Sequence, residues 1–255
     1  MNLVALGGGT NSLAMIIEMH RRGIPIDIVL FADTKAERPE TYDSIAQTDR
    51  WLKERGYGGV ITVTAEKKTL EQDCIDRNAL PSVAYGFKTC SQRFKLAPQD
   101  KFCNNYEPFK KVWSDGGKVT KFIGYDAGEE RRATNAEKYN RMDKKYEYRY
   151  PLIDWDLDRE GCIEVIKSEG LNLPGKSSCF FCPNMKKSEI VFLRKKHPDL
   201  YDRAVEIERN ADLKTIKGLG RNWSWEEFII AKESQVTMCD LFDDDEDMPC
   251  DCYDG

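Results

Sequence analysis

Three consecutive glycines near the start of the chain are the first residues whose type and spacing point to chemistry. They follow the apolar residues 3–6, and apolar residues at helical spacing resume after Ser12. A strand that turns through glycines into a helix presents free N–H groups at the helix start, and glycine lets an anion approach them closely. We therefore expect a phosphate-binding loop. Its residues are Gly7, Gly8, Gly9, Thr10, Asn11 and Ser12.

The glycine loop can be compared with three known patterns of phosphate-binding loop, and it differs from each of them. A Walker A loop requires a lysine after its last glycine, and none stands there. A dinucleotide-binding fingerprint requires a glycine in place of Ser12, although Asp33 follows at roughly the 20-residue distance of a ribose-binding acid. The SGGxDS loop of ATP pyrophosphatases differs in Gly7 for serine and Asn11 for aspartate. A turn without a ligand is the remaining alternative. If the loop holds phosphates, we expect valine at Gly8 to block the ligand and leave the fold intact.

The cysteines are the second set of residues with a chemical use. Cys179 and Cys182 have C-x-x-C spacing, which lets two thiolates reach one metal ion, and a proline follows them as in iron–sulfur sequences. A complete site needs further ligands, and the chain offers two alternatives. The first is Cys90, in a polar and basic segment. The second is the pair Cys250 and Cys252, which with the C-x-x-C would make a four-thiolate zinc site.

Other thiols and both imidazoles are expected to be structural. We expect Cys74, Cys162 and Cys239 to be small buried residues. The two histidines are His20, on an apolar helix face, and His197, at a helix end. Neither is expected to be a ligand or a general base.

Composition limits the class of protein. The 255 residues are 33% charged with a mean hydropathy of -0.61, and no apolar run approaches the length of a membrane span. Nine cysteines without a secretion signal favour reduced thiols, so we expect a cytoplasmic protein without a membrane partner. The net charge of -5 comes from eight acids in residues 239–255, and the rest of the chain holds 39 basic and 36 acidic residues. The oligomeric state is left open.

Strands and helices that alternate along the chain must position these residues. Strands are expected at 3–6, 26–31, 60–64 and 119–123, and residues 80–103 look less regular. This alternation predicts an α/β fold with a doubly wound, mostly parallel sheet and a helical C-terminal region. The glycine loop and Asp33-Thr34 then lie at strand ends, where such sheets bind ligands. We expect an α/β domain at 1–157, a helical region carrying the C-x-x-C at 158–235, and an acidic tail at 236–255.

A basic segment from Arg131 to Arg149 suggests a further partner. Its tyrosines could stack on bases, which makes tRNA or DNA a candidate substrate, and a solvated helix face is the alternative. The tyrosines are Tyr139, Tyr146, Tyr148 and Tyr150.

Six segments in a fixed order carry a family resemblance. They are GGGTNS, FADTKAERPETY, KTCSQRFKLAP, IGYDAGEERRA, YPLIDW and GKSSCFFCP. Across residues 3–185 the chain resembles the PAPS reductase-like branch of the adenine nucleotide alpha-hydrolase superfamily, which has a PP-loop and a HUP-type fold. Proteins of this kind are common in phage and bacterial genomes.

The resemblance implies a role in nucleotide binding, catalysis or metal binding for several residues. The glycine loop would hold the phosphates of ATP or another adenine nucleotide with Mg²⁺, and Asp33 and Thr34 would be the second-strand contact. Arg93 and Lys95 would face the anionic end of the nucleotide and, with Cys90, act in catalysis. Three cysteines would hold a four-iron four-sulfur cluster, with zinc as the alternative metal. They are Cys90, Cys179 and Cys182. Glu130, Arg131 and Arg132 match a family acid–arginine segment.

Departures from the family pattern shape the expected function. Asn11 replaces the loop aspartate, Cys90 stands where cluster-bearing reductases have paired cysteines, and a C-terminal Glu-Cys-Gly is absent. The leading interpretation is an enzyme that cleaves ATP to AMP and pyrophosphate to activate a substrate, with sulfur transfer to follow. A thiol-dependent PAPS or APS reductase is one alternative. A non-catalytic nucleotide-binding protein with structural zinc is another.

Overall fold

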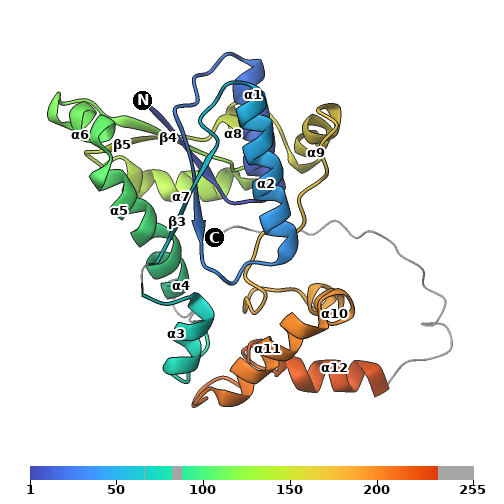
Figure 1. The fold of residues 1–255 in the computed structure, drawn as a ribbon. Coiled ribbons are helices and arrows are strands. Elements are labelled where there is room, and N and C mark those ends of the chain that lie inside the picture. Colours follow the sequence, from blue (N-terminus) through green and yellow to red (C-terminus); the bar gives the residue numbers. More distant parts are fainter. Residues whose placement is uncertain (66, 82–87, 235–255) are drawn as a thin grey trace.

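The computed structural model describes residues 1–65, 67–81 and 88–234 of the chain (Figure 1). At its centre lies a sheet of five parallel strands in the order β3-β2-β1-β4-β5. Their bounds are β1 (Asn2–Leu6), β2 (Ile28–Asp33), β3 (Val60–Thr64), β4 (Val119–Ile123) and β5 (Tyr146–Arg149). The chain builds outward from β1 to one edge and then returns past β1 to build the other. The predicted α/β class with a doubly wound parallel sheet is therefore confirmed.

Helices connect the strands, and further helices come after the last strand in the chain. The α-helices of the first part are α1 (Thr10–Arg21), α2 (Pro39–Glu54), α3 (Leu70–Asp76), α4 (Thr89–Ser91), α5 (Ala97–Asn105), α6 (Glu107–Ser114), α7 (Glu130–Asn140) and α8 (Pro151–Asp154). Later α-helices are α9 (Arg159–Ser168), α10 (Lys187–Lys196), α11 (Pro198–Asn210) and α12 (Trp225–Ser234). Two short elements of other types are η2 (Gln92–Leu96), a π-helix, and η3 (Ala127–Glu129), a 3₁₀-helix.

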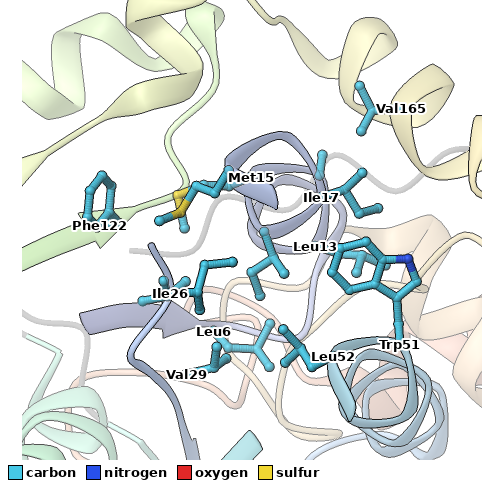
Figure 2. Close-up of a cluster of buried hydrophobic side chains, with 14 of the residues drawn as sticks. Leu6, Leu13, Met15, Ile17, Ile26, Val29, Trp51, Leu52, Phe122 and Val165 are labelled. Carbon is cyan, nitrogen blue, oxygen red and sulfur yellow. The ribbon is translucent and has the colours of Figure 1, made fainter. Parts of the chain in front are cut away.

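One face of the sheet packs on α1, which is apolar nearly all round. Leu13 and Met15 are fully buried, and Figure 2 shows the side chain of Met15 directed toward Phe122 of β4. Trp51 of α2 and Val165 of α9 belong to the same cluster, so α1 is enclosed by helices on its outer side. This enclosure fixes the start of α1, and with it the glycine loop, against the sheet.

The opposite face of the sheet packs on α5 and α6. Leu3 and Leu30 point to this face and share a cluster with Cys103 and Phe109 of these helices. The sequence interpretation left residues 80–103 less regular, whereas residues 89–105 are helical. A proline in the first turn of α5 and another in that of α6 are the signals that mark these helix starts.

A third cluster joins α10, α11 and α12 to α3 and to the loop before α10. Trp225 and Phe181 are fully buried in it. In Figure 1 these three helices gather beyond the strand ends, apart from α1 and α2. By contrast α9 packs on α1 and contributes Cys162 to the first cluster. The division of the chain at 157 and 235 stays a prediction.

The tyrosines of the basic segment serve the fold. Tyr146 and Tyr148 lie in β5, which the sequence did not predict because four residues are too few for a clear alternating pattern. Tyr146 and Tyr150 are buried, and Tyr150 stacks on Tyr125 with ring centroids 5.2 Å apart. Tyr148 donates a hydrogen bond to Asp143. The expectation that these rings stack on bases is therefore wrong for the buried Tyr146 and Tyr150, and the side chain of Tyr139 lies outside what the structure describes. A tRNA or DNA partner stays a prediction.

Some expectations fall on residues outside the described ranges. These are Cys239, Cys250, Cys252 and the acidic tail. No helix within residues 1–65, 67–81 and 88–234 combines the length and apolar character that a bilayer crossing requires.

Candidate functional site

A cavity of about 510 Å³ opens at the carboxyl ends of β1 and β4. Its walls come from parts of residues 5–12, 31–34, 88–99, 121–132 and 175–186, with Leu70 and Arg159. The strand order reverses between β1 and β4, and ligands of doubly wound sheets bind at such a point. We call this space the central cavity.

The glycine loop forms one end of the central cavity. β1 ends at Leu6 and α1 begins at Thr10. The N-cap residue is Gly9, so no N-cap side chain accepts a hydrogen bond from the free N–H groups at the start of α1. Ser12 donates its hydroxyl back to the carbonyl of Gly9 at 3.1 Å. Gly7, Gly9, Thr10, Asn11 and Ser12 all line the cavity. The helix start therefore offers several N–H donors to an anion.

Gly8 does not line the central cavity. Its φ is +82°, a conformation that favours glycine, and a Cβ built there would lie 2.9 Å from Cγ2 of Thr41 on α2. Ile45 stands next to this position. A side chain at Gly8 would thus meet α2 and not the ligand, which corrects the expectation drawn from the sequence.

We expect Gly8→Val to destabilise the protein. The branched residue must adopt a left-handed backbone conformation and displace Thr41, which should cost about 1–3 kcal/mol. Thermal unfolding measures the effect as a lower Tm. An unchanged Tm with lost ligand binding would restore the original expectation.

Asn11 has partners that explain why it is an amide. Its Nδ2 donates to Asp126 Oδ2 at 2.9 Å and to Glu129 Oε2 at 3.2 Å, and its Oδ1 accepts from Arg159 at 3.0 Å. An aspartate here would place three carboxylates together without the amide donor. The departure from the SGGxDS pattern therefore follows from the acids that β4 and η3 bring to the loop.

The predicted second-strand contact is only half inside the site. Thr34 lines the central cavity, and its hydroxyl lies 3.3 Å from Sγ of Cys179. Asp33 is turned away, because its carboxylate accepts from the backbone N–H of Lys35 at 2.7 Å and from the hydroxyl of Tyr42 at 2.9 Å. Burial and this carboxylate raise the pKa of Tyr42.

Positive charge dominates the lining of the central cavity. Among the described lining residues, seven lysines and arginines face a single carboxylate, Glu129. The seven are Lys88, Lys95, Lys121, Arg132, Arg159, Lys176 and Lys186. Such an excess over one carboxylate favours an anionic ligand.

Arg93 and Lys95 have different positions although both were expected to face a nucleotide. Lys95 lines the central cavity and pairs with the buried carboxylate of Glu37 at 3.1 Å. Arg93 does not line it. Both of its terminal nitrogens donate to Asp73 of α3 at 2.9 Å, and its side chain is half exposed. We therefore leave Arg93 out of the site.

Of the acid–arginine segment that the resemblance matched, Arg132 lines the central cavity, and the acid that does so is Glu129, one residue before Glu130. Glu130 and Arg131 are exposed at the start of α7. Glu129 and Arg132 line the central cavity and pair with each other. The guanidinium of Arg132 also lies 4.2 Å from the ring centre of Tyr125, which holds it in place.

Cys90, Cys179 and Cys182 all line the central cavity, and we call them the thiol wall. Burial raises the pKa of Cys179 well above its ordinary value, and the nearby carboxylate of Glu37 raises it further. Burial raises the pKa of Cys182 as well. Within the described ranges, no three His, Cys, Asp or Glu side chains are gathered closely enough to hold a metal ion.

The other described cysteines and histidines lie away from the central cavity. Cys74 and Cys162 are buried as expected, and burial raises the pKa of each to about 12. Cys103 is also buried. His20 contacts the hydroxyl of Tyr57, and His197 contacts Glu40.

Several lining residues were missed by sequence reasoning. Lys121 gives the clearest signal, because it is a charged residue between Val119 and Ile123 on one face of a predicted strand. Arg159 and Gln99 lie on helices outside the six segments of the resemblance. Lys176 stands in GKSSCFFCP, where only the cysteines were given a role.

No protein-family model matches the chain. The uncharacterized protein MJ0066 of Methanocaldococcus jannaschii is 27% identical over 233 residues, which cover 87% of this chain and 44% of that protein. The chain thus spans less than half the length of this curated relative. Among solved structures, the U34-tRNA thiolase NcsA from Methanococcus maripaludis with its four-iron four-sulfur cluster is similar at 18% identity. That match has a TM-score of 0.43 and covers 84% of this chain and 73% of the other. The fold class assigned above rests on the order and direction of the strands.

Proposed function

We propose that the protein is a PP-loop-type enzyme that cleaves ATP to AMP and pyrophosphate in order to activate a second substrate for sulfur transfer. The observation that carries the proposal is the composition of one cavity. The uncapped start of α1, a large excess of cations and the three cysteines of the thiol wall all line it. A triphosphate at the glycine loop and a reacting group at the thiol wall would share this space.

The residues around the glycine loop would bind and orient the phosphates. N–H groups at the start of α1 donate to phosphate oxygens, and Arg132 and Arg159 supply fixed positive charge. Arg132 is held by Glu129 and Tyr125, and Arg159 by Asn11, so their positions are set before a ligand arrives. Charge neutralisation and positioning account for most of the catalysis in phosphoryl chemistry.

The proposed reaction has two balanced steps. An oxygen of the second substrate attacks the α-phosphorus of ATP, the bond to the bridging oxygen breaks, and pyrophosphate leaves with the electron pair. A sulfide donor then attacks the activated carbon, and AMP leaves with the electrons of the carbon–oxygen bond. The second substrate thereby exchanges a carbon–oxygen bond for a carbon–sulfur bond.

Two further groups would complete the site. Glu129, the lining carboxylate, is a hard oxygen donor suited to the Mg²⁺ that neutralises ATP. The thiol wall supplies three soft sulfur donors, which suit an iron–sulfur cluster in kind. Their thiols would have to move closer together and lose their protons, because the described residues hold no ready group of three metal ligands. Such a cluster supplies sulfur or electron chemistry when bound.

The decisive experiment is anaerobic purification of the full chain, followed by metal and sulfide analysis and incubation with ATP and Mg²⁺. We expect AMP and pyrophosphate to form in the presence of an acceptor, and ATP to bind in calorimetry. Reduction of PAPS or APS without ATP cleavage would favour the reductase instead. Zinc without inorganic sulfide, together with nucleotide binding but no turnover, would favour the non-catalytic alternative.

Two neighbouring arginines provide a matched pair for the phosphate assignment. Arg132→Met should weaken ATP binding about ten- to a hundredfold, because charge-assisted hydrogen bonds contribute about 1.5–3 kcal/mol. Arg131→Met removes the same charge one residue away, outside the central cavity, and should leave the affinity unchanged. Calorimetric Kd values for the two variants test this. Equal losses would show that the effect is one of overall charge.

A further inference from the structure

The floor of the central cavity is an apolar shelf on the α5 face of the sheet. Ala5 of β1, Ala32 of β2 and Ile123 of β4 line it. Two residues earlier in β1 and β2, on the same face, stand Leu3 and Leu30, which are buried under α5 and α6. Because the two alanines are small, the sheet surface is open at this level, whereas the leucines fill it further down.

The opposite wall of this shelf comes from η2 and α5. Leu96 and Gln99 line the central cavity from these helices. An apolar floor and a wall with one apolar residue and one amide suit a flat ring that carries polar atoms on its edge. The glycine loop lies at the carboxyl end of the same strand β1, so a ligand with phosphates on the loop would place its remaining part over the shelf.

Lys121 stands at the edge of the shelf, and it differs from other lysines and arginines of the cavity in the carboxylates that lie near it. Within the described ranges no carboxylate pairs with it, and its Nζ lies 5.6 Å from the ring centre of Tyr146. Asp100 and Asp143 act on it only through space, as does the thiol of Cys103. Burial lowers the pKa of Lys121.

Three other cations of the central cavity each pair with a carboxylate. Lys95 pairs with Glu37, Lys176 with Glu189 and Arg132 with Glu129. A half-buried amine without a carboxylate is unfavourable unless a ligand satisfies it. Because Lys121 lines the cavity, the amine is accessible to such a ligand.

We propose that Lys121 is a specificity residue that donates a hydrogen bond to a ring nitrogen on the edge of the purine base of the bound nucleotide. The inference rests on the proposed function, since it assigns the base end of the ATP site. Purine edges offer acceptor nitrogens that a lysine amine can reach with a donor. Gln99 on the opposite wall can donate and accept, as the amide pairing of adenine requires.

The test compares ATP with inorganic tripolyphosphate, which has the phosphates but no base. Lys121→Met keeps the length and apolar stem of the side chain and removes the amine. We expect its affinity for ATP to fall about ten- to a hundredfold and its affinity for tripolyphosphate to stay at the wild-type value. Lys118→Met removes an exposed lysine outside the cavity and should change neither affinity. If Lys121→Met does not fold, Lys121→Leu gives the same comparison, because it also removes the donor.

Each other outcome has a definite meaning. Equal losses for ATP and tripolyphosphate would make Lys121 a phosphate contact and overturn the inference. Unchanged ATP affinity in a folded variant would overturn it as well. If wild-type protein binds tripolyphosphate but not ATP, the shelf does not bind the base, and only the assignment of the glycine loop to phosphates stands. Wild-type protein that binds neither would overturn the proposed function itself.

Discussion

Valine at Gly124 is expected to reduce ATP affinity by about a hundredfold or more. A Cβ at this position would lie 3.1 Å from the backbone N and Cα of Ser12, at the start of α1. Backbone atoms cannot rotate away as a side chain can, so the branched residue must push the end of β4 and the glycine loop apart. Hydrogen bonds to charged groups contribute about 1.5–3 kcal/mol each, so losing one or two N–H contacts to the phosphates would lower the affinity by about two orders of magnitude.

The matched control for this prediction is Gly58→Val. Nothing lies within 4 Å of a Cβ built at Gly58, which is outside the central cavity. Calorimetry with ATP should show wild-type affinity for Gly58→Val and a large loss for Gly124→Val, with circular dichroism confirming that both are folded. A folded Gly124→Val protein with normal affinity would show that the start of α1 does not hold the phosphates.

Replacing Glu189 with alanine is expected to destabilise the protein by about 3–5 kcal/mol. Its carboxylate lies 2.5 Å from Nζ of Lys176, and both side chains are at most 6% exposed. The same carboxylate accepts from the backbone N–H of Lys186 at 2.6 Å. Removing one partner of a buried pair deprives the remaining charge of its main compensation, which is the costly change.

Urea unfolding measures this effect, and an exposed pair provides the control. Glu137 of α7 pairs with Arg141, the residue after the end of this helix, and the two side chains are 53% and 81% exposed. Glu137→Ala should cost no more than about 0.5 kcal/mol. The double variant Glu189→Ala with Lys176→Met should regain part of the lost stability, because it removes the buried charge as well. Similar small effects at Glu189 and Glu137 would contradict the prediction.

Local sequence patterns were sufficient to predict which residues lie at the strand ends. The glycine run before the apolar residues of α1 placed the loop correctly, because strand, turn and helix start are all written in twelve adjacent residues. The C-x-x-C spacing likewise placed Cys179 and Cys182 on one wall. In both cases the residues that lie together in the cavity are neighbours in the chain.

Side-chain direction was beyond the reach of the sequence. Gly8 faces α2 because Thr41 packs on the loop, and Arg93 leaves the cavity because Asp73 on α3 holds it. Asp33 is likewise held by Tyr42. Each of these contacts joins segments whose relative placement only tertiary packing decides, so spacing along the chain carried no information about them.

The π-helix η2 sets the angular position of Cys90 relative to Lys95. In an α-helix of 3.6 residues per turn, a residue five positions on lies about 140° around the axis, on the far side. A π turn closes with i to i+5 hydrogen bonds, so it brings such residues back toward one side, and both Cys90 and Lys95 line the central cavity. The wider turn thus works as a phase correction, because in a regular α-helix a thiol and an amine five residues apart would lie on different sides of the helix.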